Sequence, residues 1–499
     1  MFKNFPGYSL LEKIQKNKSH KRERKLPLNA IKLIFIVAIT SVIALLPTES
    51  FGIEGLTVVH QRIISLFVFA ALMWLTEAMP SWVTSMVVVT VMLLTVSTSA
   101  FNFLRPEGVA ANGLVPFKSI MACFANPTIM LFIGGFVLAI GLTKVKLDVA
   151  LARVLLKPFG TRSEVVLLGF ILVTAIFSAF VSNTATAAMM LAFLTPVLKS
   201  LPADGKGRIA LALAIPVGAN LGGMITPIGT PPNMIALDYL SSQGMGISFV
   251  DWTIKMAPFV IVLLILAWFL LRILFPFKQK HIKIEIEGDI RWDYKTWSVV
   301  IAFILTIFMW MFGTDLWGID TNVVAMLPIA IFCATGILTR RDLEEINWSV
   351  LWMVAGGFAL GVALNYADKG GVSLSSLIVS SVPFDRFDPL VVMILAGLIC
   401  FGFSNFISHS AATSLLVPVL GVVAGGLGAA LENYGGAQAM LVGIAIASSV
   451  SMILPISTPP NAIAHSTGFI QQKDMMKVGI IIGLLGLVLG YAMLIFIGF

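Results

Sequence analysis

Ile225–Ala236 reads ITPIGTPPNMIA, and Ile453–Ala464 repeats it as ILPISTPPNAIA, with nine of twelve positions identical. Both copies lie within long apolar segments. Proline removes a backbone donor and clashes with the preceding helical turn, so the shared Thr-Pro-Pro-Asn run must interrupt a helix. In hydrocarbon, such an interruption is tolerated only where protein or a water-filled cavity satisfies the freed backbone groups. Two matched interruptions in two matched halves therefore predict a shared binding site.

The composition is that of a polytopic membrane protein. Of 499 residues, 58% are hydrophobic and 12% are charged, and the mean hydropathy is +0.96. Apolar runs of about twenty residues, long enough to cross a bilayer, recur from end to end. The net charge of +8 does not indicate a nucleic-acid partner, because seven Lys and Arg residues gather between Lys13 and Lys25, directly before the first apolar run. Such a cluster is typical of a cytoplasmic tail that obeys the positive-inside rule.

The apolar segments predict an all-α protein with eleven transmembrane helices and two re-entrant hairpins. Segments 163–198 and 390–422 are too long for one crossing and carry polar clusters at their middles, as helical hairpins do. With a cytoplasmic N-terminus, the predicted inner loops are rich in Lys and Arg, whereas 314–321 and 423–437 contain neither. We therefore expect a plasma-membrane protein whose C-terminus lies outside. The predicted crossings are 28–47, 62–78, 81–99, 121–143, 209–238, 257–276, 297–313, 322–338, 347–365, 438–465 and 477–497.

Other short motifs recur in the same order as the proline runs. Gly134-Gly135-Phe136 recurs 222 residues later at Gly356-Gly357-Phe358. Ser182-Asn183-Thr184 is echoed 226 residues later by Ser408-His409-Ser410. In the predicted topology the first set begins outside and the second begins inside. The repeats are thus inverted, and a pseudo-twofold axis in the membrane plane places the shared site near the midplane.

The segments around these motifs carry almost no ionisable side chains. Residues 165–198, 209–237 and 439–464 contain none, and 389–431 contains one, His409. The predicted site is therefore built from hydroxyls, amides, backbone groups and helix ends. Exposed helix N-termini favour a carboxylate, phosphate or sulfate, while carbonyls at the opposite helix ends suit a small cation. The spans offer no nucleophile–base pair, paired acids or metal-ligand spacing, so neither an enzyme nor a cofactor is indicated.

The motifs resemble those of the divalent anion/sodium symporter family. The likeness rests on the two hairpins, the two Thr-Pro-Pro-Asn runs, Ser182-Asn183-Thr184 with its partner at 408–410, and Thr76-Glu77-Ala78-Met79-Pro80. It implies a homodimeric elevator transporter of di- and tricarboxylates, with a scaffold domain and a moving transport domain. The implied organisation is a basic tail at 1–27, scaffold helices at 28–120, a first repeat core at 121–256, scaffold helices at 257–345, a second repeat core at 346–476 and a last helix at 477–499.

The resemblance also implies which residues bind the cargo. Substrate carboxylates are expected at Asn183, Thr184, Thr230, Pro231, Ser408, His409, Ser410, Thr458 and Pro459. A first sodium site is expected at Ser178, Ser182, Asn183 and Gly229. A second is expected at Ser404, Ile407, His409 and Ser457.

The chain departs from sodium-coupled members at His409 and Ser410, where those members carry Asn and Thr. An amide oxygen can ligate sodium, whereas imidazole offers only nitrogen and repels the ion when protonated. A protonated His409 could instead help to hold a dianion, and a neutral His409 could cap the hairpin backbone. We therefore expect sodium-independent exchange of dicarboxylates of the malate, succinate or 2-oxoglutarate type against a counter-substrate. The alternatives are sodium-coupled dicarboxylate or citrate symport and transport of an inorganic anion such as sulfate or arsenite.

Overall fold

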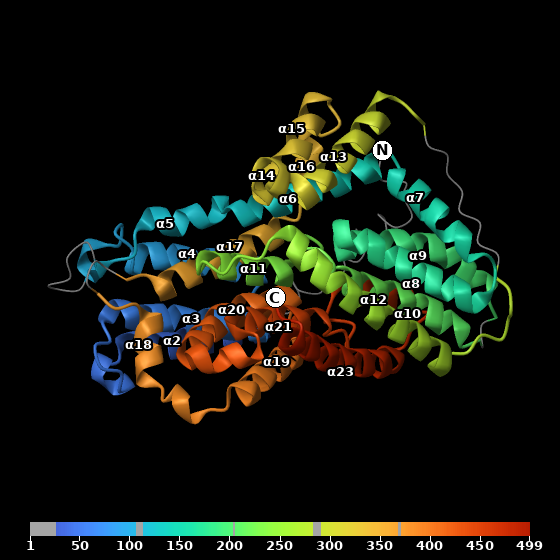
Figure 1. The fold of residues 1–499 in the computed structure, drawn as a ribbon. Coiled ribbons are helices and arrows are strands. Elements are labelled where there is room, and N and C mark those ends of the chain that lie inside the picture. The colour runs from blue at the N-terminus through green and yellow to red at the C-terminus, as the bar shows by residue number, and fades with distance from the viewer. Residues whose placement is uncertain (1–25, 106–112, 203–204, 283–290, 368–370) are drawn as a thin grey trace.

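The computed structural model describes residues 26–105, 113–202, 205–282, 291–367 and 371–499 (Figure 1). Within these ranges the chain is helical, apart from two isolated β-bridges, and forms no β-strand. The all-α prediction is thereby confirmed for the described part of the chain. Residues 1–25 of the predicted basic tail lie outside the described residues.

From α6 (Pro127–Lys144) in the first half and α17 (Trp348–Asn365) in the second, the helices follow the same order to the end of each half. The first half contains α2 (Leu26–Leu45), α3 (Val58–Thr76), α4 (Ser81–Thr95), α5 (Phe117–Ala122), α6 (Pro127–Lys144), α7 (Leu147–Leu156), α8 (Ser163–Phe180), α9 (Asn183–Ser200), α10 (Gly207–Gly222), α11 (Pro231–Ser242) and α12 (Phe249–Leu274). The second half contains α13 (Tyr294–Trp317), α14 (Thr321–Val324), α15 (Met326–Ala334), α16 (Arg340–Glu344), α17 (Trp348–Asn365), α18 (Leu374–Ser381), α19 (Pro389–Phe406), α20 (His409–Leu427), α21 (Gly436–Ser449), α22 (Pro459–Ser466) and α23 (Gln472–Phe496).

Both predicted hairpins are helix–turn–helix units. Helices α8 and α9 pack against each other, as do α19 and α20. At each tip a serine caps the second helix. Ser182 Oγ accepts from Ala185 N at 3.3 Å, and Ser408 Oγ accepts from Ala411 N at 3.2 Å. Serine is suited to this position because its side chain satisfies a backbone donor that the start of a helix leaves without a partner.

Both proline runs interrupt a helix, as their sequence requires. Helix α10 ends at Gly222 and α11 begins at Pro231, while α21 ends at Ser449 and α22 begins at Pro459. Proline is favourable at the first helical position because its missing N–H would have no intrahelical partner there. Each break therefore exposes a new helix N-terminus in the interior of the molecule.

The same packing pattern occurs in both halves. Helix α8 packs against α10, as α19 packs against α21. The second arm of each hairpin contacts the broken helix of the opposite half, α9 against α22 and α20 against α11. Helices α12 and α23 also lie side by side, so that green and red segments adjoin in Figure 1. The two halves interlock, which is the arrangement expected for a pseudo-twofold pair around one shared site.

The repeated Gly-Gly-Phe motifs mark close helix contacts. A Cβ atom at Gly134 would lie 2.4 Å from Ala325 O, next to α15, and a Cβ atom at Gly356 would lie 2.3 Å from Ser85 Cβ on α4. Real Cβ atoms do not approach other atoms this closely, so both positions require glycine. The motif recurs because each half brings one of its helices close to a helix of the other half.

One predicted crossing begins later than its range. The helix predicted over 121–143 starts at Pro127, and the residues before it form α5 and a 3-10 turn. Asn126 sets this start, because its side chain accepts from Thr128 N at 2.7 Å. An Asn cap followed by Pro at the first helical position is a strong start signal that hydropathy alone overlooked.

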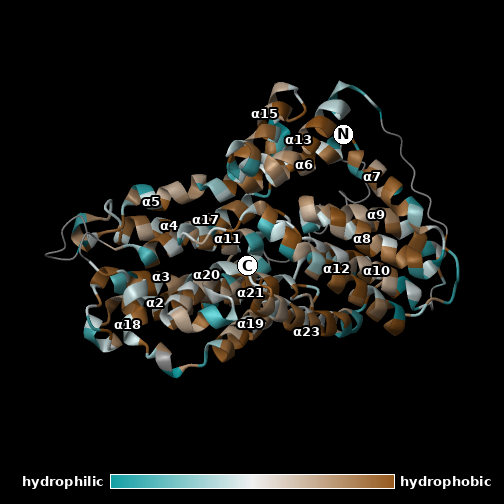
Figure 2. Cartoon of the chain, in the orientation of Figure 1, coloured by the Kyte–Doolittle hydropathy of each residue, from teal (hydrophilic) through white to brown (hydrophobic). Residues whose placement is uncertain are grey.

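Many large hydrophobic side chains are exposed on the outside of the molecule, and brown, hydrophobic residues recur along the helices in Figure 2. On α13, for example, Ile301, Ile304 and Phe308 are all exposed. Nine helices of the described part are long and apolar enough to cross a membrane, and three of these are hairpin arms. The molecule is therefore a multi-pass membrane protein. The count of eleven crossings, the re-entrant course of the hairpins and the division into scaffold and transport segments stay predictions.

Candidate functional site

In the first half, oxygen atoms converge between the hairpin tip and the break. Ser178 Oγ donates to Ala219 O at 2.7 Å. In one orientation of the Asn183 amide, its nitrogen donates to Ser178 Oγ (2.6 Å), Gly229 O (3.1 Å) and Ala219 O (3.3 Å). In the other orientation the amide oxygen takes this place and accepts from Ser178 Oγ at 2.6 Å. The first orientation satisfies the surrounding acceptors without an ion. The second gathers oxygen atoms around one point, which is the chemistry that a small hard cation requires.

Two glycines keep this oxygen cluster compact. A Cβ atom at Gly223 would lie 2.4 Å from Asn183 Oδ1, and one at Gly229 would lie 2.4 Å from Gly223 O. A side chain at Gly223 would push the hairpin tip away from the break, and one at Gly229 would force apart two parts of the break itself. The structure thus brings together three of the four residues predicted for the first sodium site, Ser178, Asn183 and Gly229. Ser182, the fourth, directs its hydroxyl to the cap of α9 instead.

In the second half, the equivalent positions are occupied by internal hydrogen bonds. His409 is 8% exposed, and its Nε2 lies 2.5 Å from Ser451 O in the break. Ser404 Oγ donates to Ser448 Oγ at 3.3 Å, and Ser457 Oγ donates to Asn405 O at 3.0 Å. Ile407, also predicted for the second sodium site, is buried at the hairpin tip, 1% exposed.

The difference between the halves follows from two substitutions within the repeat. Where the first break has Gly223 and Gly229, the second has Ser451 and Ser457. Ser451 Oγ donates to carbonyls in its own half, and Ser457 Oγ also accepts from Leu454 N at 3.0 Å. The second half thus has two hydroxyls and an imidazole at positions where the first half has two glycines and an amide.

The predicted substrate residues all lie at helix N-termini. They are the cap or the first two residues of four helices: Asn183 and Thr184 (α9), Thr230 and Pro231 (α11), Ser408, His409 and Ser410 (α20), and Thr458 and Pro459 (α22). Thr230 and Thr458 are almost fully buried, whereas Asn183, Thr184 and Ser408 are half-buried. Helix N-termini present unpaired N–H groups and partial positive charge, which favour an anion without any basic side chain.

Sequence reasoning missed the asparagines that hold this framework. Asn233 Nδ2 donates to Gly223 O (3.0 Å) and Thr226 O (2.9 Å), so the Asn of the first Thr-Pro-Pro-Asn run fastens the loop of its own break. Asn461 does the same for the second break. Their presence in both copies of the motif was the available signal. Asn220 carried no comparable signal, although its side chain crosses from the first half to the second.

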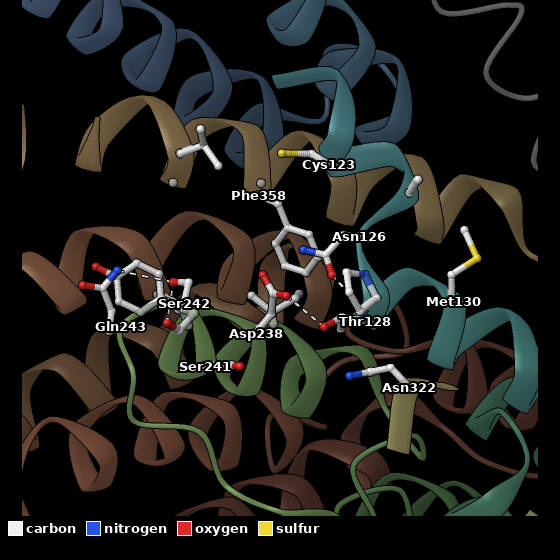
Figure 3. Close-up of a pocket in the computed structure, with 18 of the residues that line it drawn as sticks. Cys123, Asn126, Thr128, Met130, Asp238, Ser241, Ser242, Gln243, Asn322 and Phe358 are labelled. Carbon is white, nitrogen blue, oxygen red and sulfur yellow. Dashed lines mark hydrogen bonds between the residues drawn. The ribbon is translucent and has the colours of Figure 1, made fainter. Parts of the chain in front are cut away.

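A cavity of about 820 Å³ opens beside this framework, between α6, α11, α14, α17 and α20. Figure 3 shows Asp238 inside it, where the carboxylate accepts from Thr128 Oγ1 at 2.8 Å. None of the nine predicted substrate residues lines this cavity. Among the described lining residues, the charged side chains are Asp238 and Asp320, and none is Lys, Arg or His. This cavity therefore repels a dianion, unlike the four helix N-termini. Asp238 escaped the sequence analysis because it stands at the very end of a predicted crossing.

Helical hairpins with uncharged polar tips and paired helix breaks are the features of a multi-pass membrane transporter. The matching family and the relatives named below are transporters, so the chain is a transporter and not an enzyme. It belongs to the family described as the sodium:sulfate symporter transmembrane region, whose model matches residues 28–498. The predicted membership of the divalent anion/sodium symporter family is thereby confirmed.

Relatives cover nearly the whole chain. An uncharacterized transporter of Haemophilus influenzae is 30% identical over 471 residues, which cover 91% of this chain and 94% of the relative. The sodium-dependent dicarboxylate transporter SdcS of Staphylococcus saprophyticus is 28% identical over 464 residues, with coverage of 85% and 84%. In fold, the chain is similar to the crystal structure of the YdaH transporter of Alcanivorax borkumensis, with a TM-score of 0.52 at 13% identity over 83% of this chain and 98% of that one.

Proposed function

We propose that this chain moves C4 and C5 dicarboxylates, such as malate, succinate or 2-oxoglutarate, across the plasma membrane. The observation that carries the proposal is the placement of polar groups at the N-termini of α9, α11, α20 and α22, two from each half. Two pairs of helix N-termini suit an anion with two negative groups. The name of the SdcS relative, a sodium-dependent dicarboxylate transporter, supports the same substrate class.

For the coupling mode, we favour exchange of one dicarboxylate for another without sodium. The contact of His409 Nε2 with Ser451 O supports this choice, because an imidazole N–H there satisfies the carbonyl that a cation would otherwise need. The hydroxyls of Ser451 and Ser457 are also engaged, with the carbonyls of Phe401, Ala447 and Asn405. A second sodium ion would have to displace several hydrogen bonds, each worth about 1 kcal/mol or more once its partner is buried.

Sodium-coupled symport of a dicarboxylate or citrate is the second candidate. The oxygen cluster of Ser178, Asn183, Ala219 and Gly229 favours it, since this cluster could hold one sodium ion. Transport of an inorganic anion such as sulfate or arsenite is a third candidate, which the name of the matching family model favours. Helix N-termini alone do not separate these anions from carboxylates.

For the mechanism, we propose a homodimer that works by an elevator movement, with the hairpins and broken helices moving as one body against the remaining helices. The interlocking of α9 with α22 and of α20 with α11 supports this, because these four elements cannot separate without losing the site. The proposed orientation has the N-terminus in the cytoplasm and the C-terminus outside.

Counterflow into proteoliposomes tests the function. Vesicles loaded with unlabelled succinate should take up labelled succinate in sodium-free buffer, and empty vesicles should not. A strict sodium requirement would replace exchange by symport. Labelled sulfate taken up in place of succinate, with no competition by succinate, would overturn the dicarboxylate proposal itself.

A further inference from the structure

Asn220 joins the two halves of the chain by linking α10 to α22. Its Nδ2 donates to Thr458 Oγ1 at 3.2 Å and to Asn461 Oδ1 at 3.1 Å. Asn220 lies near the end of α10, whereas its two partners lie at the N-terminus of α22 in the opposite half. The side chain is 1% exposed, so both hydrogen bonds lie in the dry interior, where the loss of a partner is costly.

The hydrogen bonds that Asn220 makes to the opposite half have no counterpart at the equivalent position of the other repeat. Asn461 and Asn233 are equivalent residues of the two Thr-Pro-Pro-Asn runs, and each donates to two carbonyls of its own break. Asn461 Oδ1 accepts from Asn220, but the buried Asn233 Oδ1 has no hydrogen-bond partner among the described residues. The repeat counterpart of Asn220 is Ser448, whose hydroxyl donates to His409 O at 3.0 Å within its own half. The internal repeat alone therefore does not account for the contact that Asn220 makes with the opposite half.

The neighbour of Asn220 belongs to the first-half oxygen cluster. Ala219 O accepts from Ser178 Oγ, while the next side chain along α10 reaches Thr458 in the second half. Two consecutive residues thus contact groups from both halves. A shift of α10 by a fraction of an ångström would move both sets of groups together.

We infer that Asn220 is a positioning residue that holds Thr458 and the N-terminus of α22 against the first hairpin, so that the two half-sites bind one diacid together. This inference rests on the proposed function. Without the link each half keeps its own hydrogen bonds, so the fold persists. The grip on the substrate weakens, because its two carboxylates no longer meet both half-sites at the correct separation.

Kinetics of succinate exchange test the inference. Asn220→Ser installs the residue found at the equivalent position 448, and should raise KM about tenfold, the cost of about one net hydrogen bond to a neutral partner. The maximal rate should stay within about twofold, as expected for loss of an interaction made in binding. Thr306→Val is the control, since Thr306 is a buried polar residue whose hydroxyl donates to Ala302 O in its own helix, α13. It should leave KM unchanged.

Two further variants separate positioning from a general structural role. Asn220→Asp keeps the side-chain size and can accept from the Thr458 hydroxyl, but it cannot donate to Asn461 and adds a negative charge beside the diacid. Its KM should exceed that of Asn220→Ser. Thr458→Val combined with Asn220→Ser should be no worse than the poorer single variant, because residues that act through one contact are not additive.

Each of the following outcomes would overturn either the positioning role of Asn220 or the proposed function. An unchanged KM in Asn220→Ser, additive effects with Thr458→Val, or failure of both Asn220 variants to accumulate as folded protein would overturn the positioning role. If the wild-type protein exchanges no dicarboxylate, the proposed function fails instead. The two failures are thus distinguishable in one set of measurements.

Discussion

Lys144, the last residue of α6, forms an ion pair with Asp342 in α16. Lys144 Nζ also donates to Ile337 O at 2.5 Å. Asp342 accepts from Thr339 N at 2.6 Å and is 4% exposed, so the pair closes the cap of α16. The connection between α15 and α17 is thereby fastened to α6, which carries the first Gly-Gly-Phe motif.

This ion pair should stabilise the protein measurably. Burial alone would raise the pKa of Asp342, but hydrogen bonds from Lys144 and Thr339 outweigh it and hold the pKa below its usual value of 3.8. Lys144→Met should cost roughly 1–3 kcal/mol at neutral pH, as for a lost hydrogen bond to a charged group, and thermal unfolding in detergent would show it as a lower Tm.

The pH dependence of this stabilisation has a definite sign. A lowered carboxyl pKa adds stability above the unfolded value, and this stability is lost as the pH falls through the folded pKa. The difference between wild type and Lys144→Met should therefore be constant at neutral pH and shrink below pH 3.8. Arg340→Met is the control, since Arg340 and Glu344 form an exposed pair and such pairs contribute little. An equal loss in both variants would contradict the stabilising role of the Lys144–Asp342 pair.

Much of the site could be predicted from sequence because its signals are local and repeated. Proline fixes where α11 and α22 begin, and serine caps fix where α9 and α20 begin, so the residue pattern alone places Asn183 and His409 at helix starts. The contact from Asn220 to Thr458 could not be predicted. A single amide in an apolar helix forms no repeating pattern. Its partner lies 238 residues away, and their contact depends on how the two halves pack together. The role of Ser451 was equally hidden, because the sequence does not show which carbonyls the serine hydroxyl contacts.

Asn183→Ala and His409→Ala should each lower succinate exchange at least about tenfold, because each removes a polar group from a helix N-terminus that we propose binds the anion, and each leaves buried partners unpaired. Initial rates of counterflow measure this, with size-exclusion profiles to confirm folded protein. Thr195→Val is the matched control in the same hairpin, since its hydroxyl donates to Leu191 O within α9. Near-normal exchange in either alanine variant would remove that residue from the site.

Gly229→Ala should abolish exchange and lower stability by about 1–3 kcal/mol, the usual cost of forcing an atom into a packed interior. Its Cβ would lie 2.4 Å from Gly223 O and would force the break open, which would displace Gly229 O from the oxygen cluster. Gly135→Ala is the control, because its Cβ would meet Ile228 at an ordinary 3.8 Å. Thermal unfolding and counterflow of the two variants measure the effect. Wild-type behaviour of Gly229→Ala would mean that the oxygen cluster need not be compact.

Replacing three residues of the second half by their equivalents from the first half should make succinate uptake respond to sodium. His409→Asn alone should remain insensitive to sodium, because the hydroxyls of Ser451 and Ser457 still stand where the first half has the glycines Gly223 and Gly229. The triple variant His409→Asn, Ser451→Gly, Ser457→Gly removes the imidazole and both hydroxyls, and it should show succinate uptake that sodium stimulates and choline does not. Uptake in matched sodium and choline buffers measures this for the wild type and both variants. Sodium stimulation already present in the wild type would place the ion in the first-half cluster. If a folded triple variant shows no sodium stimulation, then the imidazole and the two hydroxyls of the second half are not what excludes the cation.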